Sequence, residues 1–402
     1  MQTSTDVFAK VRDHDRAAVL AAAREADVLP YFHVLSSPAM PVVEMEGAER
    51  IMLGSNNYLG LTGDERVMQG AEDALHRFGT GLTGSRLLNG TIPLHLELES
   101  EIAEWMQTED ALVFSTGHQA NLGALGTLLG PADTVIVDSG DHASILDGCL
   151  LSRAKLRPFR HNRLEKLEKM LERAQGDGGG VLVAVDGVFS MEGDIAPLPE
   201  YTAICNDYDV AFMVDDAHGV GVLGKNGRGT AEHFGLEHKV DLIMGTFSKS
   251  LATVGGFVVG EPDVIKFIKH RARALMFTAA PPPASVAAVL AALDIIESEP
   301  ERRERLWDNT RFMMTSLRAI GFDCGNSATP VIPIVVGPDE VAFQMAKRLD
   351  DEGVFVNAVV SPGSPPGRAL IRTSYMATHT TAHLTRALEA FRKVGREMGL
   401  VS

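Results

Sequence analysis

Residues 214–221 read Val214-Asp215-Asp216-Ala217-His218-Gly219-Val220-Gly221 and continue an apolar run that starts at residue 210. A short apolar run of this kind predicts a strand that is buried on both faces of a sheet. In open α/β sheets, functional side chains lie just beyond the carboxyl ends of such strands. Asp215 and His218 are therefore candidate site residues, although an acid here could also cap the next turn or contribute to a metal site.

A second apolar run, residues 242–244, leads into Gly245-Thr246-Phe247-Ser248-Lys249-Ser250. Lys249 lies among small hydroxyl side chains, which is unlike a solvated surface lysine. Hydroxyl groups suit a phosphate, and a lysine amine suits an aldehyde. A P-loop is excluded because its G-x-x-x-x-G-K-[ST] pattern is absent at Lys249. The alternative interpretation is a plain surface loop.

Apolar runs alternate with helical patterns over the first two thirds of the chain. We predict strands at residues 111–114, 134–137, 180–185, 210–214 and 242–244, with helices such as 164–174 and 198–206 between them. Short buried strands separated by helices predict an α/β fold, in which a mostly parallel sheet has helices on both faces.

The alternation changes after Pro281-Pro282-Pro283. A long helix is predicted over residues 284–297, and helices and strands then mix in an α+β pattern. The later predicted elements are helices 302–320, 340–352 and 380–398 and strands 331–335, 354–357 and 369–373. We therefore expect an N-terminal helix (6–27) and irregular arm within residues 1–50, a large domain over 51–283, and an interdomain helix with a smaller C-terminal domain over 284–402.

The bulk properties narrow the class of protein. The 402 residues carry a formal net charge of -16, which disfavours nucleic acid and anionic membrane surfaces as partners. The N-terminus lacks the apolar segment of a secretory signal, and no apolar run approaches the roughly 20 residues that span a bilayer. Cys149, Cys205 and Cys324 form no disulfide or zinc pattern. We expect a cytoplasmic protein with no membrane span, nucleic-acid partner or metal site.

Gly79-Thr80-Gly81-Leu82-Thr83-Gly84 matches the dinucleotide pattern G-x-G-x-x-G. That pattern binds a dinucleotide only when a strand precedes it and a helix follows. Here the preceding residues 67–78 have a helical pattern, and the turn Asn89-Gly90 follows. We therefore reject a nicotinamide-dependent enzyme.

Five residues together fit one cofactor, pyridoxal 5'-phosphate (PLP). PLP requires a lysine for its aldehyde, a carboxylate at its pyridine nitrogen, a donor at its phenolic oxygen, a group stacked on its ring and donors to its phosphate. Lys249, Asp215, His218, His142 and Thr246 supply these groups.

From about residue 51 to residue 401 the chain resembles the α-oxoamine synthases, PLP-dependent acyltransferases with a fold of type I. The segments that carry the resemblance are 55–60 (SNNYLG), 84–91 (GSRLLNGT), 141–148 (DHASILDG), 186–194 (DGVFSMEGD), 214–218 (VDDAH), 245–249 (GTFSK) and 371–373 (IRT). The resemblance implies the type I fold, with a large α/β/α domain and a small α+β domain.

The resemblance also implies roles around the ring of the cofactor. Lys249 would hold PLP as a Schiff base and later move protons at the α-carbon of the substrate. Asp215 would keep the pyridine nitrogen protonated, and His218 would donate to the phenolic oxygen. His142 would stack on the ring, and Ser190 would lie near its edge.

The phosphate and the substrate have their own implied residues. Thr246 and the backbone N–H groups of Gly117 and His118 would hold the phosphate. Thr278 resembles a residue that reaches the phosphate of the partner subunit, which implies a homodimer with active sites at the subunit interface. The substrate residues implied are Asn56 and Arg372, with Arg372 binding the carboxylate of the amino acid.

The implied reaction joins a small amino acid (serine, glycine or alanine) to an acyl thioester of coenzyme A or of an acyl carrier protein. Carbon dioxide is lost and an α-amino ketone forms. Within the family, residues 114–117, 246–257 and 277–279 are most similar to bacterial serine palmitoyltransferases. Two departures favour other members: His118 replaces a usual aromatic residue, and residues 357–363 lack an arginine.

Several alternatives therefore stay open. Within the family they are glycine C-acetyltransferase, 8-amino-7-oxononanoate synthase and a synthase of secondary metabolism. An aminotransferase or a racemase would use the same fold for a different reaction. A non-catalytic cofactor-binding protein is disfavoured by the intact Lys249, Asp215 and His218.

Overall fold

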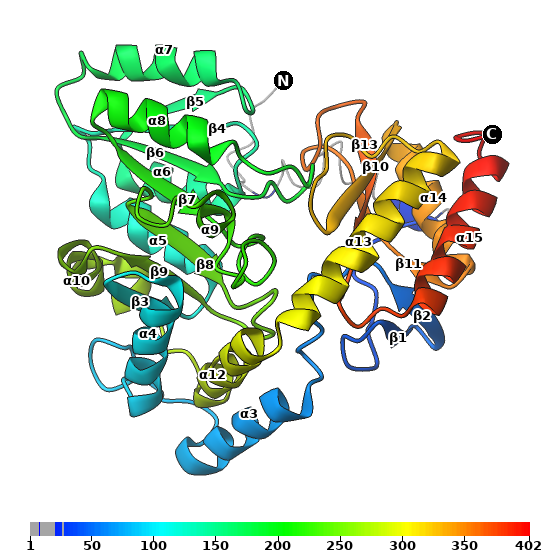
Figure 1. Cartoon of the computed structure of the whole chain (residues 1–402), viewed down its shortest axis with the longest axis horizontal. Helices are drawn as coiled ribbons and strands as arrows, with labels where there is room; N and C mark the ends of the chain where they lie inside the picture. Colours follow the sequence, from blue (N-terminus) through cyan, green and yellow to red (C-terminus); the bar gives the residue numbers. More distant parts are fainter. Residues whose placement is uncertain (1–7, 9–20, 26–27) are drawn as a thin grey trace.

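The computed structural model describes Phe8, residues 21–25 and residues 28–402. Residues 21–25 are helical, and most of the predicted N-terminal helix 6–27 lies outside the described residues. Figure 1 shows a large sheet between layers of helices, beside a group of smaller sheets. In the part of the chain that the structure describes, no helix is long and apolar enough to cross a bilayer.

The large sheet has seven strands in the order β3-β9-β8-β7-β6-β4-β5. Their bounds are β3 (Asp110–Phe114), β4 (Thr134–Asp138), β5 (Lys155–Phe159), β6 (Val181–Asp186), β7 (Ala211–Asp215), β8 (Leu242–Thr246) and β9 (Gly256–Gly260). The five strands β5, β4, β6, β7 and β8 are parallel to one another, whereas β9 is antiparallel to both of its neighbours, β8 and β3. The predicted α/β class and mostly parallel sheet are confirmed.

Helices cover both faces of this sheet because successive side chains of each strand point to opposite sides. Val135, Ala184 and Met213 enter one core, under α5 (Gly117–Leu128), α6 (Ala143–Ser152), α10 (Pro262–Arg271) and α11 (Arg273–Met276). Ile136 and Val183 enter the other, under α7 (Leu164–Ala174) and α8 (Leu198–Tyr208). The short α9 (Thr230–Phe234) adjoins α8.

Strands β5 and β9 did not follow from the sequence. Strand β5 is an edge strand with charged residues and Pro158, a composition that keeps edges from pairing further. Strand β9 begins and ends with glycine, so it lacks the flanking pattern of a buried strand. Gly256 is required there, because a Cβ atom would lie 2.5 Å from the Cα of Gly117.

Four helices lie between the large sheet and the rest of the chain. Helix α12 (Pro283–Ser298) packs on α3 (Glu65–Phe78) and α4 (Pro93–Met106). Helix α13 (Pro300–Ile320), yellow in Figure 1, then runs toward the smaller sheets. Because α3 directly precedes Gly79, the G-x-G-x-x-G match follows a helix, as the sequence predicted.

Two three-stranded sheets form the second group of strands. One contains β10 (Val331–Gly337), β13 (Ala369–Ser374) and β12 (Asn357–Val359), and the other contains β1 (Val42–Met45), β2 (Ala48–Met52) and β11 (Val354–Phe355). Helices α14 (Asp339–Asp351) and α15 (Thr381–Glu397) lie beside them, at the right of Figure 1.

Two local predictions about these strands were wrong. The predicted arm within residues 1–50 is not irregular throughout, because β1 and β2 form a hairpin over residues 42–52. The predicted strand 354–357 is divided, because β11 pairs with β2 whereas β12 pairs with β13 in the other sheet. Strand β2 crosses the predicted boundary at residue 50, and the three domain ranges stay a prediction.

A buried ion pair ties the segment around residue 86 to α4. Arg86 donates to both carboxylate oxygens of Glu99, at 2.9 and 3.0 Å, and Glu99 also accepts from the backbone N–H of Val113 at 3.1 Å. Both side chains are buried. The negative charge of Glu99 therefore balances the positive charge of Arg86, which is shielded from water.

We predict that Glu99→Ala lowers the free energy of unfolding by about 3–5 kcal/mol, because it leaves the charge of Arg86 buried without a partner. Urea unfolding would measure this change. Glu97→Ala, on an exposed position of the same helix, should change the free energy of unfolding by less than about 0.5 kcal/mol. Equal effects of the two changes would contradict the prediction.

Candidate active site

The candidate site is a cavity of about 560 Å³ at the carboxyl ends of β6, β7 and β8. Parallel strands end at the same edge of a sheet, so side chains distant in sequence meet there. Ten of the predicted site residues line the cavity: Asn56, Gly117, His118, His142, Ser190, Asp215, His218, Thr246, Lys249 and Arg372. Thr278 is the predicted site residue that does not line it.

Asp215 is the last residue of β7 and is buried. One carboxylate oxygen accepts from the Asn121 amide at 2.7 Å, and the other accepts from the backbone N–H of Ala217 at 3.0 Å. The bond from Ala217 confirms that Asp215 caps the next turn. The same carboxylate also lines the cavity. Asn121 on α5 was missed by the sequence reasoning, because no motif marks it.

His218 lies next to Tyr58, whose hydroxyl is 2.6 Å from Nδ1 of the imidazole. Burial, with the nearby charges of Lys249 and Arg372, lowers the pKa of His218 well below its ordinary value. Burial also raises the pKa of Tyr58 to about 12, so the phenol keeps its proton. A neutral imidazole that accepts at Nδ1 carries its proton on Nε2 and is a hydrogen-bond donor there.

Lys249 follows the end of β8 by three residues and lines the cavity. Burial lowers the pKa of Lys249 from 10.5 to about 8, although the carboxylate of Asp215 opposes the shift. No described residue forms a hydrogen bond or ion pair with its amine. A buried amine with a lowered pKa is the form in which lysine attacks an aldehyde.

A cluster of hydroxyl and N–H groups lies beside Lys249. The Thr246 hydroxyl is 2.9 Å from that of Ser248, and both line the cavity with the start of α5. A Cβ atom at Gly117 would lie 2.7 Å from the Thr246 hydroxyl, so only glycine allows this approach. The first N–H groups of a helix have no partner within it and bind anions, phosphate included.

His142 lies immediately before α6 and accepts from the backbone N–H of Ser144 at 3.3 Å, with its Nδ1 2.7 Å from the Ser144 hydroxyl. Asn121 donates to the same hydroxyl at 2.8 Å. The chain of contacts from His142 through Ser144 and Asn121 to Asp215 fixes the imidazole relative to the carboxylate.

Arg372 and Asn56 meet in the cavity. The Arg372 guanidinium donates to the Asn56 side-chain oxygen at 3.0 Å, to the Ser190 carbonyl at 2.6 Å and to the hydroxyl of Ser374 at 3.0 Å. Arg372 is buried but forms no ion pair with a described residue. A buried guanidinium without a carboxylate partner is suited to an anionic substrate.

Thr278 lies outside the cavity and accepts from the side-chain amide of Gln119 at 3.1 Å. Gln119 is in the first turn of α5, two residues after Gly117. The role of Thr278 toward a partner subunit stays a prediction.

These groups fit PLP by the chemistry of their donors. An amine without a partner suits its aldehyde, and a buried carboxylate suits its ring nitrogen. Hydroxyls beside a helix N-terminus suit its phosphate. Lys249, Asp215 and Thr246 would hold these three parts, and His218 would donate to the phenolic oxygen. No cluster of three or more potential metal-binding side chains occurs among the described residues.

The chain is similar to known proteins over most of its length. The sequence model of the family "Aminotransferase class I and II" matches residues 48–391. A serine palmitoyltransferase of Sphingobacterium spiritivorum is 48% identical over 92% of this chain and 93% of its own. An 8-amino-7-oxononanoate synthase of Symbiobacterium thermophilum is 44% identical over 91% of this chain and 94% of its own.

The solved structure of a serine palmitoyltransferase from S. paucimobilis with bound PLP and myriocin is also similar. It superposes with a TM-score of 0.95 at 38% identity, covering 98% of this chain and 100% of that chain. Fold and site thus define a PLP-dependent enzyme of fold type I. The chain belongs to the α-oxoamine synthase family of PLP-dependent acyltransferases.

The lowered pKa of Lys249 predicts how the apo-protein takes up PLP. Only the unprotonated amine attacks an aldehyde, and burial lowers its pKa to about 8. The rate of covalent attachment should therefore rise with pH to half its maximum near pH 8, instead of near the ordinary 10.5. Stopped-flow absorbance of the PLP band would measure it, and a midpoint near the ordinary lysine value would contradict the prediction.

Proposed function

We propose that this enzyme condenses a small amino acid with an acyl thioester, releasing carbon dioxide and a free thiol and leaving an α-amino ketone. One observation carries the proposal: a buried arginine without an ion-pair partner lines the same cavity as the lysine. The arginine supports binding of an amino acid by its carboxylate, and the lysine supports proton transfer at the α-carbon.

Each residue has a defined task in this proposal. Bound PLP supplies an electron sink for the negative charge that develops at the α-carbon. Lys249 removes the α-proton, for which a pKa of about 8 is close to the working pH. Asp215, held by Asn121, would keep a proton at the ring nitrogen of PLP, and His218 would donate from Nε2 to its phenolic oxygen. The amino acid gains an acyl group at its α-carbon as the carbon–sulfur bond of the thioester breaks.

The first choice of substrates is serine with a long-chain acyl-coenzyme A. Relatives named serine palmitoyltransferase support it at 43–48% identity. The 8-amino-7-oxononanoate synthase relatives support that activity as a second choice. Serine palmitoyltransferases and 8-amino-7-oxononanoate synthases are both expected to have an arginine in the segment that corresponds to residues 357–363. In this chain, that segment contributes the amide of Asn357 and the apolar side chain of Val359 to the cavity.

A thiol-release assay separates these choices. Glycine, alanine and serine would each be paired with short and long acyl-coenzyme A, and free thiol and carbon dioxide would be measured. Serine with a long acyl chain should give the largest rate. Thiol release only from an acylated carrier protein would replace coenzyme A as the donor, and amino transfer to a keto acid without thiol release would support an aminotransferase.

A homodimer is part of the proposal. Leu88 and Phe277, 80% and 71% exposed, lie in segments that contact each other, since the backbone N–H of Ala280 donates to the Gly84 carbonyl. Exposed apolar side chains of this size are typical of subunit interfaces. Leu88→Glu should shift the mass measured by light scattering from dimer to monomer.

A cytoplasmic location is also proposed, supported by the buried free thiols of all three cysteines.

A further inference from the structure

The loop of residues 188–195, which contains Ser190, is attached to the C-terminal part of the chain at two points. The Ser190 carbonyl accepts from Nε of Arg372 at 2.6 Å. The Gly193 carbonyl accepts from the hydroxyl of Thr329 at 2.8 Å and from the backbone N–H of Ala328 at 3.0 Å. The position of the loop and the direction of the Arg372 guanidinium are therefore linked.

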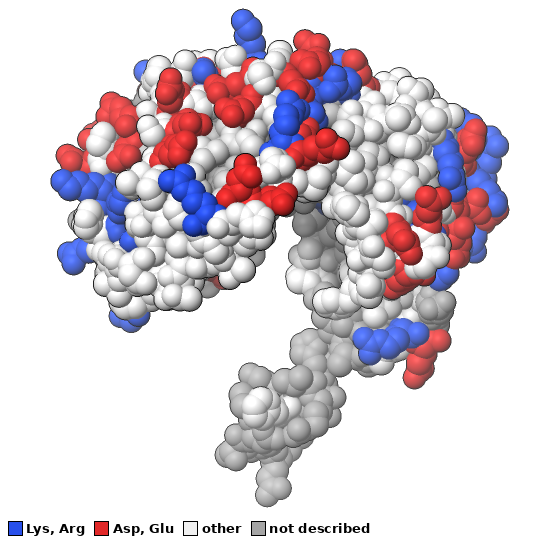
Figure 2. All heavy atoms as spheres, turned by 90° about the horizontal axis from the view of Figure 1, so that it is seen from below, with Lys and Arg blue, Asp and Glu red and all other residues white. Residues whose placement is uncertain are grey.

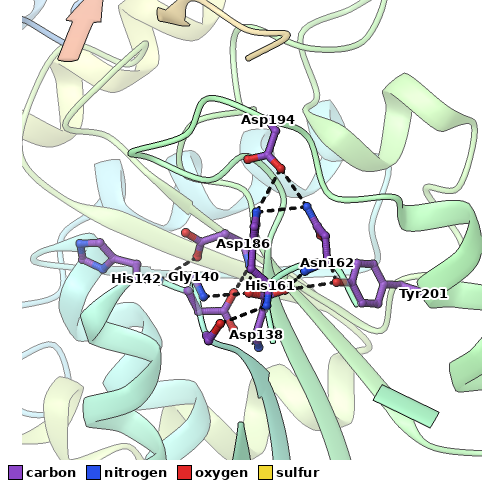
Figure 3. A network of polar contacts seen from close by, with 10 residues as sticks. Asp138, Gly140, His142, His161, Asn162, Asp186, Asp194 and Tyr201 are labelled. Atoms are coloured by element: carbon purple, nitrogen blue, oxygen red, sulfur yellow. Dashed lines mark hydrogen bonds and ion pairs between the residues drawn. The ribbon is translucent and has the colours of Figure 1, made fainter. Parts of the chain in front are cut away.

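A separate cluster holds the other side of the same loop (Figure 3). Asp194 lies 3.1 Å from Nε2 of His161 and accepts from the Asn162 amide at 2.8 Å. Nδ1 of His161 lies 3.0 Å from Asp138 at the end of β4. The imidazole thus bridges the end of a core strand and the loop.

The imidazole bridges these residues as a cation. Burial alone would lower the pKa of His161, but its hydrogen bonds to Asp138 and Asp194 outweigh that and raise the pKa to about 10. Both ring nitrogens then donate, each to a carboxylate. The imidazole also packs edge-on against the Phe189 ring at 4.3 Å between centroids, which fixes a second residue of the loop.

We propose that His161 is a positioning residue, which orients Arg372 toward the carboxylate of the amino acid substrate through the 188–195 loop. The inference rests on the proposed function, in which Arg372 binds that carboxylate. His161 does not line the cavity. It forms no hydrogen bond, ion pair or ring contact with the predicted catalytic residues, which are Lys249, His142, Asp215 and His218.

The physical reason is that Arg372 has no carboxylate of its own to fix its direction. Its Nε–H is anchored to a backbone carbonyl of the loop, at the shortest of its three contacts. A loop released from Asp194 would shift that carbonyl, and the guanidinium would turn with it. A displacement of about 1 Å is enough to cost up to 100-fold in a site of this kind.

The test compares two ligands of the PLP-loaded enzyme, L-serine and ethanolamine, which is serine without its carboxylate. Dissociation constants would come from the absorbance change of bound PLP. His161→Gln should weaken serine binding about tenfold and ethanolamine binding by no more than about twofold. Asp194→Asn, which removes the charge on the loop side of the bridge, should give the same pattern.

Arg372→Gln separates this inference from the proposed function. That change should weaken serine but not ethanolamine, and His161→Gln added to it should weaken serine no further, because both act on one interaction. The matched control is His76→Gln, an exposed histidine paired with Glu72 on α3, which should bind both ligands as the parent does.

The outcomes are distinct. Equal weakening of both ligands, unchanged serine binding or loss of PLP in His161→Gln and Asp194→Asn would each overturn the positioning role. Additive effects of His161→Gln and Arg372→Gln would overturn it too. If Arg372→Gln leaves the preference for serine unchanged, the proposed function fails at its carboxylate site instead.

Discussion

Lys249→Ala should reduce thiol release by at least about 10⁴-fold, because in the proposed function this residue supplies both the amine that holds PLP and the base at the α-carbon. No described residue forms a hydrogen bond or an ion pair with this buried amine. After borohydride reduction, the parent protein should gain the mass of PLP on the peptide that contains Lys249. The variant should gain no such mass.

The loss should not come from unfolding. A pKa lowered from 10.5 to about 8 means that the folded apo-protein carries the lysine charge at a cost of about 3 kcal/mol below pH 8. Between pH 8 and 10.5 the unfolded chain binds more protons than the folded one, so stability rises with pH in that window. At neutral pH, Lys249→Ala should therefore stabilise the apo-protein, apart from the cavity it leaves.

Lys225→Ala is the matched control, since Lys225 is exposed and lies outside the cavity. It should change neither PLP attachment nor thiol release. A Lys249→Ala enzyme that keeps more than about a hundredth of the parent rate would show that another group is the base.

The sequence was sufficient to predict the edge at which Asp215 and Lys249 meet. Both follow short apolar runs, and neighbouring parallel strands end on the same side, so local patterns were enough to place the two residues in one cavity. The ends of these strands can be predicted from the sequence, because burial on both faces makes each strand a continuous apolar run.

The partners of these residues could not be predicted in the same way. Asn121 lies 94 positions from Asp215, and Tyr58 lies 160 positions from His218. Their contacts depend on how helices and loops pack around the sheet, and no periodicity encodes that. The direction of β9 could not be predicted either, because the turn at residues 247–255 makes this strand antiparallel to β8.

For Arg372, the role could be predicted from the sequence but the contacts could not. The motif predicted its role, but its bonds to Asn56 and to the Ser190 carbonyl join segments 316 and 182 positions away. In the bridge through His161, Asp194 lies in a family segment but His161 and Asp138 do not, so the bridge became visible only as a set of distances.

Asp215→Asn should lower kcat/KM for thiol release by about 10³-fold, because a neutral amide does not hold a proton at the ring nitrogen of PLP. The local geometry makes the amide a poor substitute. Asp215 accepts from the Asn121 amide and from the backbone N–H of Ala217, and both partners donate. An asparagine would place its own NH₂ group against one of these donors, so one hydrogen bond would be lost in either orientation.

The variant should still attach PLP, because Lys249 is unchanged, and this separates loss of chemistry from loss of cofactor. Asp215 also raises the pKa of Lys249 against the effect of burial. Without that charge the pKa should fall below about 8, so PLP attachment should reach half its maximum rate at a lower pH than in the parent. Asn121→Ala keeps the carboxylate of Asp215 but removes the donor to one of its oxygens. It should change the pH midpoint of PLP attachment and the rate of thiol release less than Asp215→Asn does. An Asp215→Asn enzyme with a normal rate and an unshifted midpoint would remove the carboxylate from the mechanism, whereas a shifted midpoint with a normal rate would limit its role to the charge balance around Lys249.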